Sequence, residues 1–150
     1  MAVTTKAATE ALEVRRTFNA PRRRVFDAWT QADEIKKWAA PGAMTVAHAE
    51  SDLRVGGKYR IHMRAPDGQE HRVFGVYRVV DPPKKVVYTW TWETAPDVTN
   101  TIVTVEFHER GKATEIVLRH EGLDTAEQRK RHEEGWVGCL DKVGRLVSAR

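Results

Sequence analysis

The stretch from Asp52 to Trp92 reads DLRVGGKYRIHMRAPDGQEHRVFGVYRVVDPPKKVVYTWTW. It holds three runs of strand length, separated by two segments that interrupt a strand. Pro66-Asp67-Gly68 is a turn sequence, because proline presets φ and glycine accepts a positive φ. Asp81-Pro82-Pro83 lacks the amide donors that a ladder of strands needs. The stretch therefore predicts an antiparallel meander of three strands.

Within these runs the side chains alternate with a period of two. In the first run, Tyr59, Ile61 and Met63 share one face, opposite Lys58, Arg60, His62 and Arg64. The last run repeats the pattern with larger groups, and Tyr88, Trp90 and Trp92 oppose Thr89, Thr91 and Glu93. This alternation is typical of a half-buried antiparallel sheet. Its inner face is unusually aromatic.

The flanking sequence predicts further elements of the same domain. Pro21 suits the first turn of a helix, where its missing amide costs nothing, and Val25, Phe26 and Trp29 then lie on one helical face. The other expected elements are a strand over Leu12–Asn19, a short helix over Asp33–Trp38, and strands over Met44–Ala49, Asn100–Glu109 and Thr114–His120.

A long final helix is expected to begin after Asp124 or Thr125, either of which can cap it. Its apolar stripe consists of Trp136, Cys139, Leu140, Val143, Leu146 and Val147. Burying this stripe is worth on the order of 10 kcal/mol, so it must lie on the apolar face of the sheet. Gly135, Gly138 and Gly144 indicate either close packing or room beside the helix. The predicted fold class is α+β, an antiparallel sheet wrapped around one C-terminal helix.

Bulk properties narrow the class of protein. The 150 residues predict a single domain over residues 12–150 with a loose tail over residues 1–11. Neither a membrane span nor a signal peptide is visible, so we expect no membrane partner and a cytoplasmic location. The net charge is +4, but the densest basic run, Arg22-Arg23-Arg24, is better explained as a solvated face than as a nucleic-acid site.

The sequence carries none of the common catalytic or cofactor motifs. It has no phosphate loop, nucleophile elbow or HExxH pattern, and Gly56-Gly57 is interpreted as a bend. The only cysteine, Cys139, lies in the apolar stripe and is interpreted as a core residue. We therefore expect no cofactor, no metal site and no catalytic residue.

The six histidines do not show metal-ligand spacing. His62, His71 and His108 are expected on solvated strand faces, and His132 on the charged side of the last helix. His120 shares an inward face with apolar residues, so it is either a hydrogen-bonded residue at the rim or a ligand contact or general base. His48 is a weaker candidate of the same kind.

A sheet curved enough to hold one helix tends to leave space between the two. Aromatic rings with polar tips suit an apolar ligand held by one or two hydrogen bonds. The residues expected to line such a cavity are Trp38, Tyr59, Ile61, Met63, Tyr88, Trp90, Trp92, Val105, Phe107, Leu118, His120, Trp136, Cys139, Leu140 and Val143.

Three motifs resemble the activator-of-heat-shock-protein-90-ATPase-like proteins of the START-like (SRPBCC) superfamily: DLRVGGKYRIHMRAPDG, GVYRVVDPPKKVVYTW, and LRHEGL before EEGW. The resemblance covers roughly Val14 to Val147. It implies a helix-grip fold with a seven-stranded sheet, two short helices after the first strand, and a C-terminal helix closing a hydrophobic cavity. It also suggests a stress-response context.

Function follows less directly, since one fold hosts many chemistries. The first hypothesis is binding of a hydrophobic or aromatic small molecule. The second is a co-chaperone-like module that contacts a heat-shock protein; the eukaryotic co-chaperone has a further N-terminal domain, which we do not expect in this protein. The third is a polyketide cyclase-like enzyme, for which His120, Tyr59, Tyr88 and His48 are the available polar groups. A monomer or a homodimer is expected.

Overall fold

The computed structural model describes residues 11–95 and 97–148, so the predicted tail over residues 1–11 lies outside the described residues except for Ala11. Seven strands and three helices are arranged in the predicted order. Their bounds are β1 Leu12–Phe18, α2 Arg22–Thr30, α3 Ala32–Ile35, β2 Thr45–Ser51, β3 Lys58–Arg64, β4 Glu70–Asp81, β5 Lys85–Trp92, β6 Thr101–Arg110, β7 Ala113–Glu121 and α4 Ala126–Ser148.

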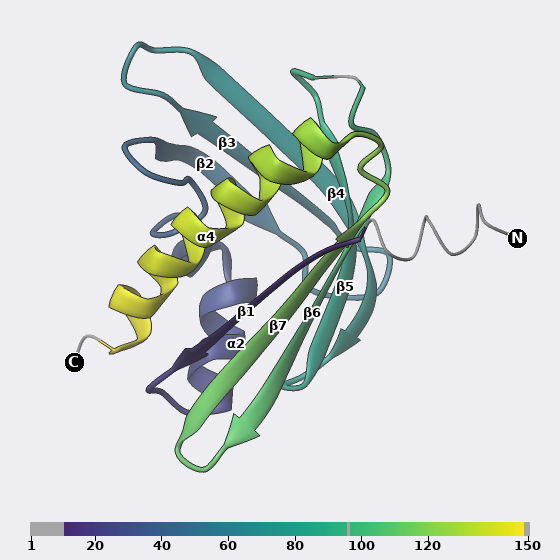
Figure 1. Ribbon diagram of the computed structural model, residues 1–150. Coiled ribbons are helices and arrows are strands. Elements are labelled where there is room, and N and C mark those ends of the chain that lie inside the picture. Colours follow the sequence, from purple (N-terminus) through teal and green to yellow (C-terminus); the bar gives the residue numbers. More distant parts are fainter. Residues whose placement is uncertain (1–10, 96, 149–150) are drawn as a thin grey trace, which may run out of the picture.

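The strands form one antiparallel sheet in the order β1-β7-β6-β5-β4-β3-β2. The sheet curls, and α4 crosses its concave side diagonally while α2 lies between α4 and one end of the sheet (Figure 1). This arrangement confirms the predicted α+β helix-grip fold. The short second helix ends at Ile35, earlier than the expected Trp38, and β2 begins one residue later than expected and extends to Ser51.

Both predicted turns of the meander are present. The first closes with a hydrogen bond from the Gly68 amide to the Ala65 carbonyl at 2.9 Å, and Gly68 has a φ of 89° that favours glycine. In the second, the Lys84 amide donates to the Asp81 carbonyl at 2.7 Å. The turn residues thus set the pairing that places the aromatic faces of β3 and β5 on the same side of the sheet.

Helix α4 begins with a capping box that chooses between the two predicted caps. The Gln128 amide donates to the Thr125 hydroxyl at 3.0 Å, and the Thr125 amide donates back to the Gln128 side-chain oxygen at 3.3 Å. Thr125 is therefore the N-cap.

No helix in the described part of the chain is long and apolar enough to span a membrane.

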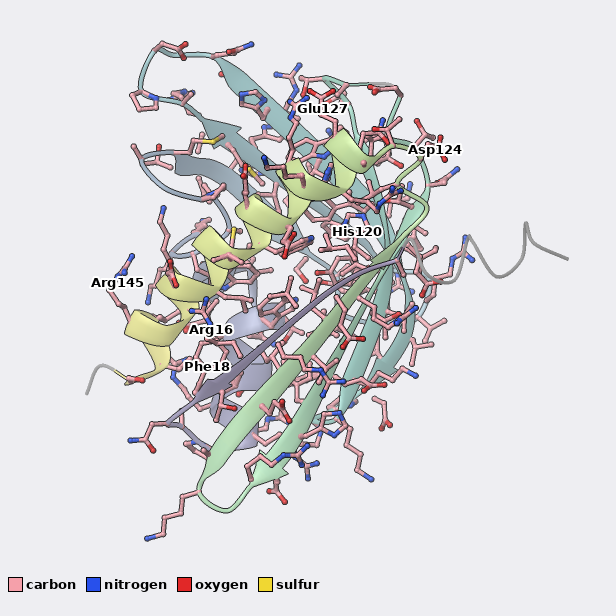
Figure 2. All side chains as sticks on the ribbon, viewed as in Figure 1. Arg16, Phe18, His120, Asp124, Glu127 and Arg145 are labelled. Atoms are coloured by element: carbon pink, nitrogen blue, oxygen red, sulfur yellow. The ribbon has the colours of Figure 1, made fainter. Side chains whose placement is uncertain are left out.

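The C-terminal half of α4 packs directly against β1. Arg16 forms an ion pair with Asp141 at 2.7 Å, and Figure 2 shows Arg16 and Phe18 beside this half of the helix. A Cβ on Gly144 would lie 3.3 Å from the Phe18 ring, so glycine permits the close approach. Leu140 and Val143 are fully buried here. This half of the interface between helix and sheet is closed.

Candidate functional site

The other half of that interface is open. Between β3–β5 and the N-terminal half of α4 lies a cavity of about 500 Å³, which α2, α3 and the loop before β2 also line. This volume is in the range of small-molecule sites. Three segments surround the opening of the cavity, and each contributes a residue to the lining. Thr94 comes from the loop that follows β5, Gln69 from the turn between β3 and β4, and Gln128 from the first turns of α4.

Nine of the residues predicted to line a cavity do so in the structure. They come from the segment after α3, from the inner faces of β3 and β5, and from the inward stripe of α4. These residues are Trp38, Tyr59, Ile61, Met63, Tyr88, Trp90, Trp92, Trp136 and Cys139.

Six of the predicted residues lie elsewhere, in the core outside the cavity lining. They belong to β6, β7 and the later turns of α4, and are Val105, Phe107, Leu118, His120, Leu140 and Val143. All are buried at 5% exposure or less. The alternation of the strands identified the inward face of the strand residues correctly. In front of most of these residues, α2 and the packed half of α4 fill the space, whereas the rings of Trp90 and Trp136 lie beside His120.

The sequence interpretation missed the polar rim of the cavity. His71 and His132 were expected in solvated positions, and both line the cavity instead. His71 pairs with Met63 across β3 and β4 and alternates with Val73, so it shares their inward face. His132 lies on the part of α4 that contacts β5 through Trp92. Arg131 and Asp97 are the charged side chains of this rim among the described residues, apart from the titratable histidines. His48 lies outside the lining, half exposed on β2, with Nε2 at 2.5 Å from Glu50.

The inner end of the cavity is rich in tyrosine. Tyr77 was missed, although the alternation of Val73, Gly75 and Tyr77 along β4 was a signal that could have found it. The Tyr59 hydroxyl donates to the Thr89 carbonyl at 2.5 Å. Gly75 makes this contact possible, because a Cβ there would lie 2.0 Å from the Thr89 oxygen and 2.7 Å from the Tyr59 ring.

The hydroxyl groups of Tyr77 and Tyr88 differ in whether the protein supplies an acceptor for their proton. Ser51 donates its single hydroxyl proton to the Thr30 carbonyl at 2.8 Å, so Tyr77 donates to Ser51 at 2.7 Å. The Tyr88 oxygen accepts from Trp29 Nε1 at 3.2 Å, and its own proton has no acceptor among the described residues. Burial raises the pKa of Tyr88, which keeps the phenol neutral.

His120 is a structural residue behind the cavity wall. Trp136 Nε1 donates to His120 Nδ1 at 3.1 Å, so the proton of the neutral ring lies on Nε2, which donates to Thr101 Oγ1 at 2.8 Å. Thr101 in turn donates to the Trp90 carbonyl at 2.8 Å. Burial lowers the pKa of His120 to about 3. Figure 2 shows His120 between the sheet and the first half of α4.

A second indole–imidazole pair joins the sheet to the helix at the rim. His132 Nδ1 donates to the Gln128 carbonyl at 2.8 Å, which leaves Nε2 free to accept from Trp92 Nε1 at 2.9 Å. Burial, with the Arg131 charge, lowers the pKa of His132. Both histidines are therefore held neutral as acceptors, so neither is placed to act as a base in the cavity.

The cavity was also considered as a metal site and as the site of a reactive thiol. The described residues contain no group of three or more His, Cys, Asp or Glu side chains suited to hold a metal ion. Cys139 lines the cavity, but burial raises the pKa of its thiol to about 12. The thiolate needed for nucleophilic attack is thus suppressed.

A curled antiparallel sheet that grips a long C-terminal helix, with a cavity between them, defines a START-like (SRPBCC) protein. Two of the solved structures that share it are similar to this chain over almost its whole length. A Chromobacterium violaceum protein is 25% identical with a TM-score of 0.87, over 95% of this chain and 99% of that one. An AHSA1 protein from Silicibacter pomeroyi is 26% identical with a TM-score of 0.81, over 92% of this chain and 97% of that one.

Within that superfamily the chain belongs to the Activator of Hsp90 ATPase homolog 1-like protein family, whose model matches residues 19–148. This match confirms the resemblance carried by the motifs of β3, β5 and β7. None of the curated proteins matches the chain.

Proposed function

We propose that this protein binds a hydrophobic or aromatic small molecule in the cavity between the sheet and α4. The observation that carries the proposal is a cavity of about 500 Å³ whose lining includes Trp29, Trp38, Tyr59, Tyr88 and Trp90. Aromatic side chains offer large apolar surfaces at little entropic cost, and their neutral hydrogen-bonding tips can orient a ligand. A protein that only needed a stable core would fill this volume, because an apolar void weakens packing.

The test is a fluorescence titration with 1-aminoanthracene, a small aromatic compound, in the wild type and in a variant with a narrowed cavity. Gly135 lines the cavity, and a Cβ there would meet only Pro41, at 4.0 Å. Gly135→Leu should therefore narrow the site while leaving the helix intact. Val137→Leu, on the exposed side of α4, is the matched control.

We expect saturable binding in the wild type and in Val137→Leu, and weaker binding in Gly135→Leu at unchanged helical content. Failure of the wild type to bind would contradict the proposal. Equal binding by Gly135→Leu would place the site elsewhere on the protein.

A second candidate, supported by the family description, is a co-chaperone-like contact with a heat-shock ATPase. Such a contact would act through the surface. A purified heat-shock protein 90 should then hydrolyse ATP faster in the presence of the wild type and equally fast with Gly135→Leu. An unchanged rate with the wild type would exclude this function for that partner.

A further inference from the structure

The hydrogen-bonding groups of the inner cavity wall are almost all committed within the protein. Four of the five tryptophans donate their indole proton: Trp29 to Tyr88, Trp38 to the Ala28 carbonyl, Trp92 to His132, and Trp136 to His120. Of the three tyrosines, Tyr59 and Tyr77 donate to Thr89 and Ser51.

Two donors on β5 stand apart from this pattern. The Tyr88 proton has no acceptor among the described residues, and the Trp90 Nε1 is buried without a partner there. Both residues line the cavity from the same face of the strand. A buried donor without an acceptor costs about 1–3 kcal/mol, so an oxygen supplied by a ligand would be favoured at this wall. The Trp90 nitrogen itself is buried. The Tyr88 hydroxyl lies beside Trp29, and Tyr88 packs against Tyr59; both neighbours also line the cavity, so we take Tyr88 as the donor to a ligand.

The charge distribution restricts what that oxygen can be. The charged groups of the described lining, Asp97 and Arg131, belong to the rim, and the residues around Tyr88 (Trp29, Tyr59 and Tyr77) are neutral. An ionised carboxylate beside Tyr88 would be buried without a counter-charge, at a cost of several kcal/mol. A neutral oxygen avoids that cost.

We propose that the ligand is a neutral, apolar carbonyl compound, such as an aromatic ketone, quinone or ester, whose oxygen accepts a hydrogen bond from Tyr88. This inference rests on the proposed function, because it specifies the ligand of the same cavity. Tyr88 is then the residue that selects carbonyl compounds over hydrocarbons of the same shape.

The test uses benzophenone and diphenylmethane, which differ by a carbonyl in place of a methylene. Their affinities are measured by calorimetry for the wild type, Tyr88→Phe and Tyr77→Phe. Tyr77→Phe is the matched control, since it deletes the same hydroxyl from the same cavity but one whose proton is already committed to Ser51. The readout is the affinity for benzophenone divided by the affinity for diphenylmethane. The difference in hydrophobicity between the compounds contributes equally to this ratio in every protein, so it cancels when a variant is compared with the wild type.

We expect the ratio to fall about 3- to 10-fold in Tyr88→Phe and to stay at the wild-type value in Tyr77→Phe. In parallel, the infrared carbonyl band of bound benzophenone should lie at lower frequency in the wild type than in a hydrocarbon solvent. Absence of that shift overturns the inference even if Tyr88→Phe folds poorly. An unchanged ratio overturns only the role of Tyr88, whereas binding of neither compound to the wild type overturns the proposed function as well.

Discussion

Substituting alanine for Gly135 or for Gly138 of α4 should change the stability of the protein by different amounts. Both are interior helix positions, where glycine is about 1 kcal/mol less favourable than alanine. At Gly135 a new Cβ would meet only Pro41 Cγ at 4.0 Å, because the cavity lies beside it. At Gly138 it would lie 2.9 Å from Pro41 Cβ, in a ring that cannot rotate away.

Gly135→Ala should therefore raise the free energy of unfolding by about 1 kcal/mol. Gly138→Ala gains the same helix propensity but forces an overpacked contact that costs about 1–3 kcal/mol, so its net effect lies between neutral and a loss of about 2 kcal/mol. The two variants should differ by about 1–3 kcal/mol. In Gly144→Ala the new Cβ would lie 3.3 Å from the Phe18 ring, which can shift more easily than Pro41. The change in the free energy of unfolding for this variant should therefore lie between those of the other two.

Urea denaturation of the three variants beside the wild type measures these differences, provided that the slope m is constant. Equal stabilisation by Gly135→Ala and Gly138→Ala would refute the close contact with Pro41. Destabilisation by Gly135→Ala would refute the open space assigned to the cavity.

Three further predictions concern single residues. His120 has a pKa of about 3 in the folded protein, against the ordinary 6.5, so it stays neutral at a pH where the unfolded chain binds a proton. The free energy of unfolding should therefore fall as the pH drops below 6.5, by about 2 kcal/mol near pH 5. Urea denaturation should show this loss in the wild type and much less of it in His120→Asn, and an equal dependence on pH in both proteins would contradict the assignment. Cys139, buried with a pKa of about 12, should react with Ellman's reagent only at the rate of unfolding, and rapid reaction of the native protein would speak against this burial. Gly75→Ala would place a Cβ 2.0 Å from the Thr89 oxygen and should cost about 3 kcal/mol or more in urea denaturation, whereas a loss below about 1 kcal/mol would show that β4 and β5 can separate there.

The sheet and its inner face followed from local patterns in the sequence. The period of two in β3 and β5 identified Tyr59 and Trp90 as inward residues, and the turn chemistry at Gly68 fixed how the strands meet. The stripe of α4 showed that a helix must cover this face. These features depend on neighbours in the chain, which the sequence displays directly.

The extent of the cavity did not follow from the same patterns. Alternation tells which face of a strand is inward, but not where along the strand the helix lies close to the sheet. Leu118 and Trp90 are both inward residues, yet Leu118 meets packed side chains and Trp90 lines the cavity. The position of His132 at the rim was hidden for a related reason, since its pairing with Trp92 joins residues forty positions apart.

The half-open interface between α4 and the sheet divides the chain into positions with different tolerance to evolutionary change. Truncating Leu118 or Leu140 leaves a new void in a filled region, which costs about 2–5 kcal/mol. Truncating Ile61 or Met63 enlarges a space that already exists, so less packing is lost. Single substitutions at the cavity can therefore accumulate while the closed half maintains the fold.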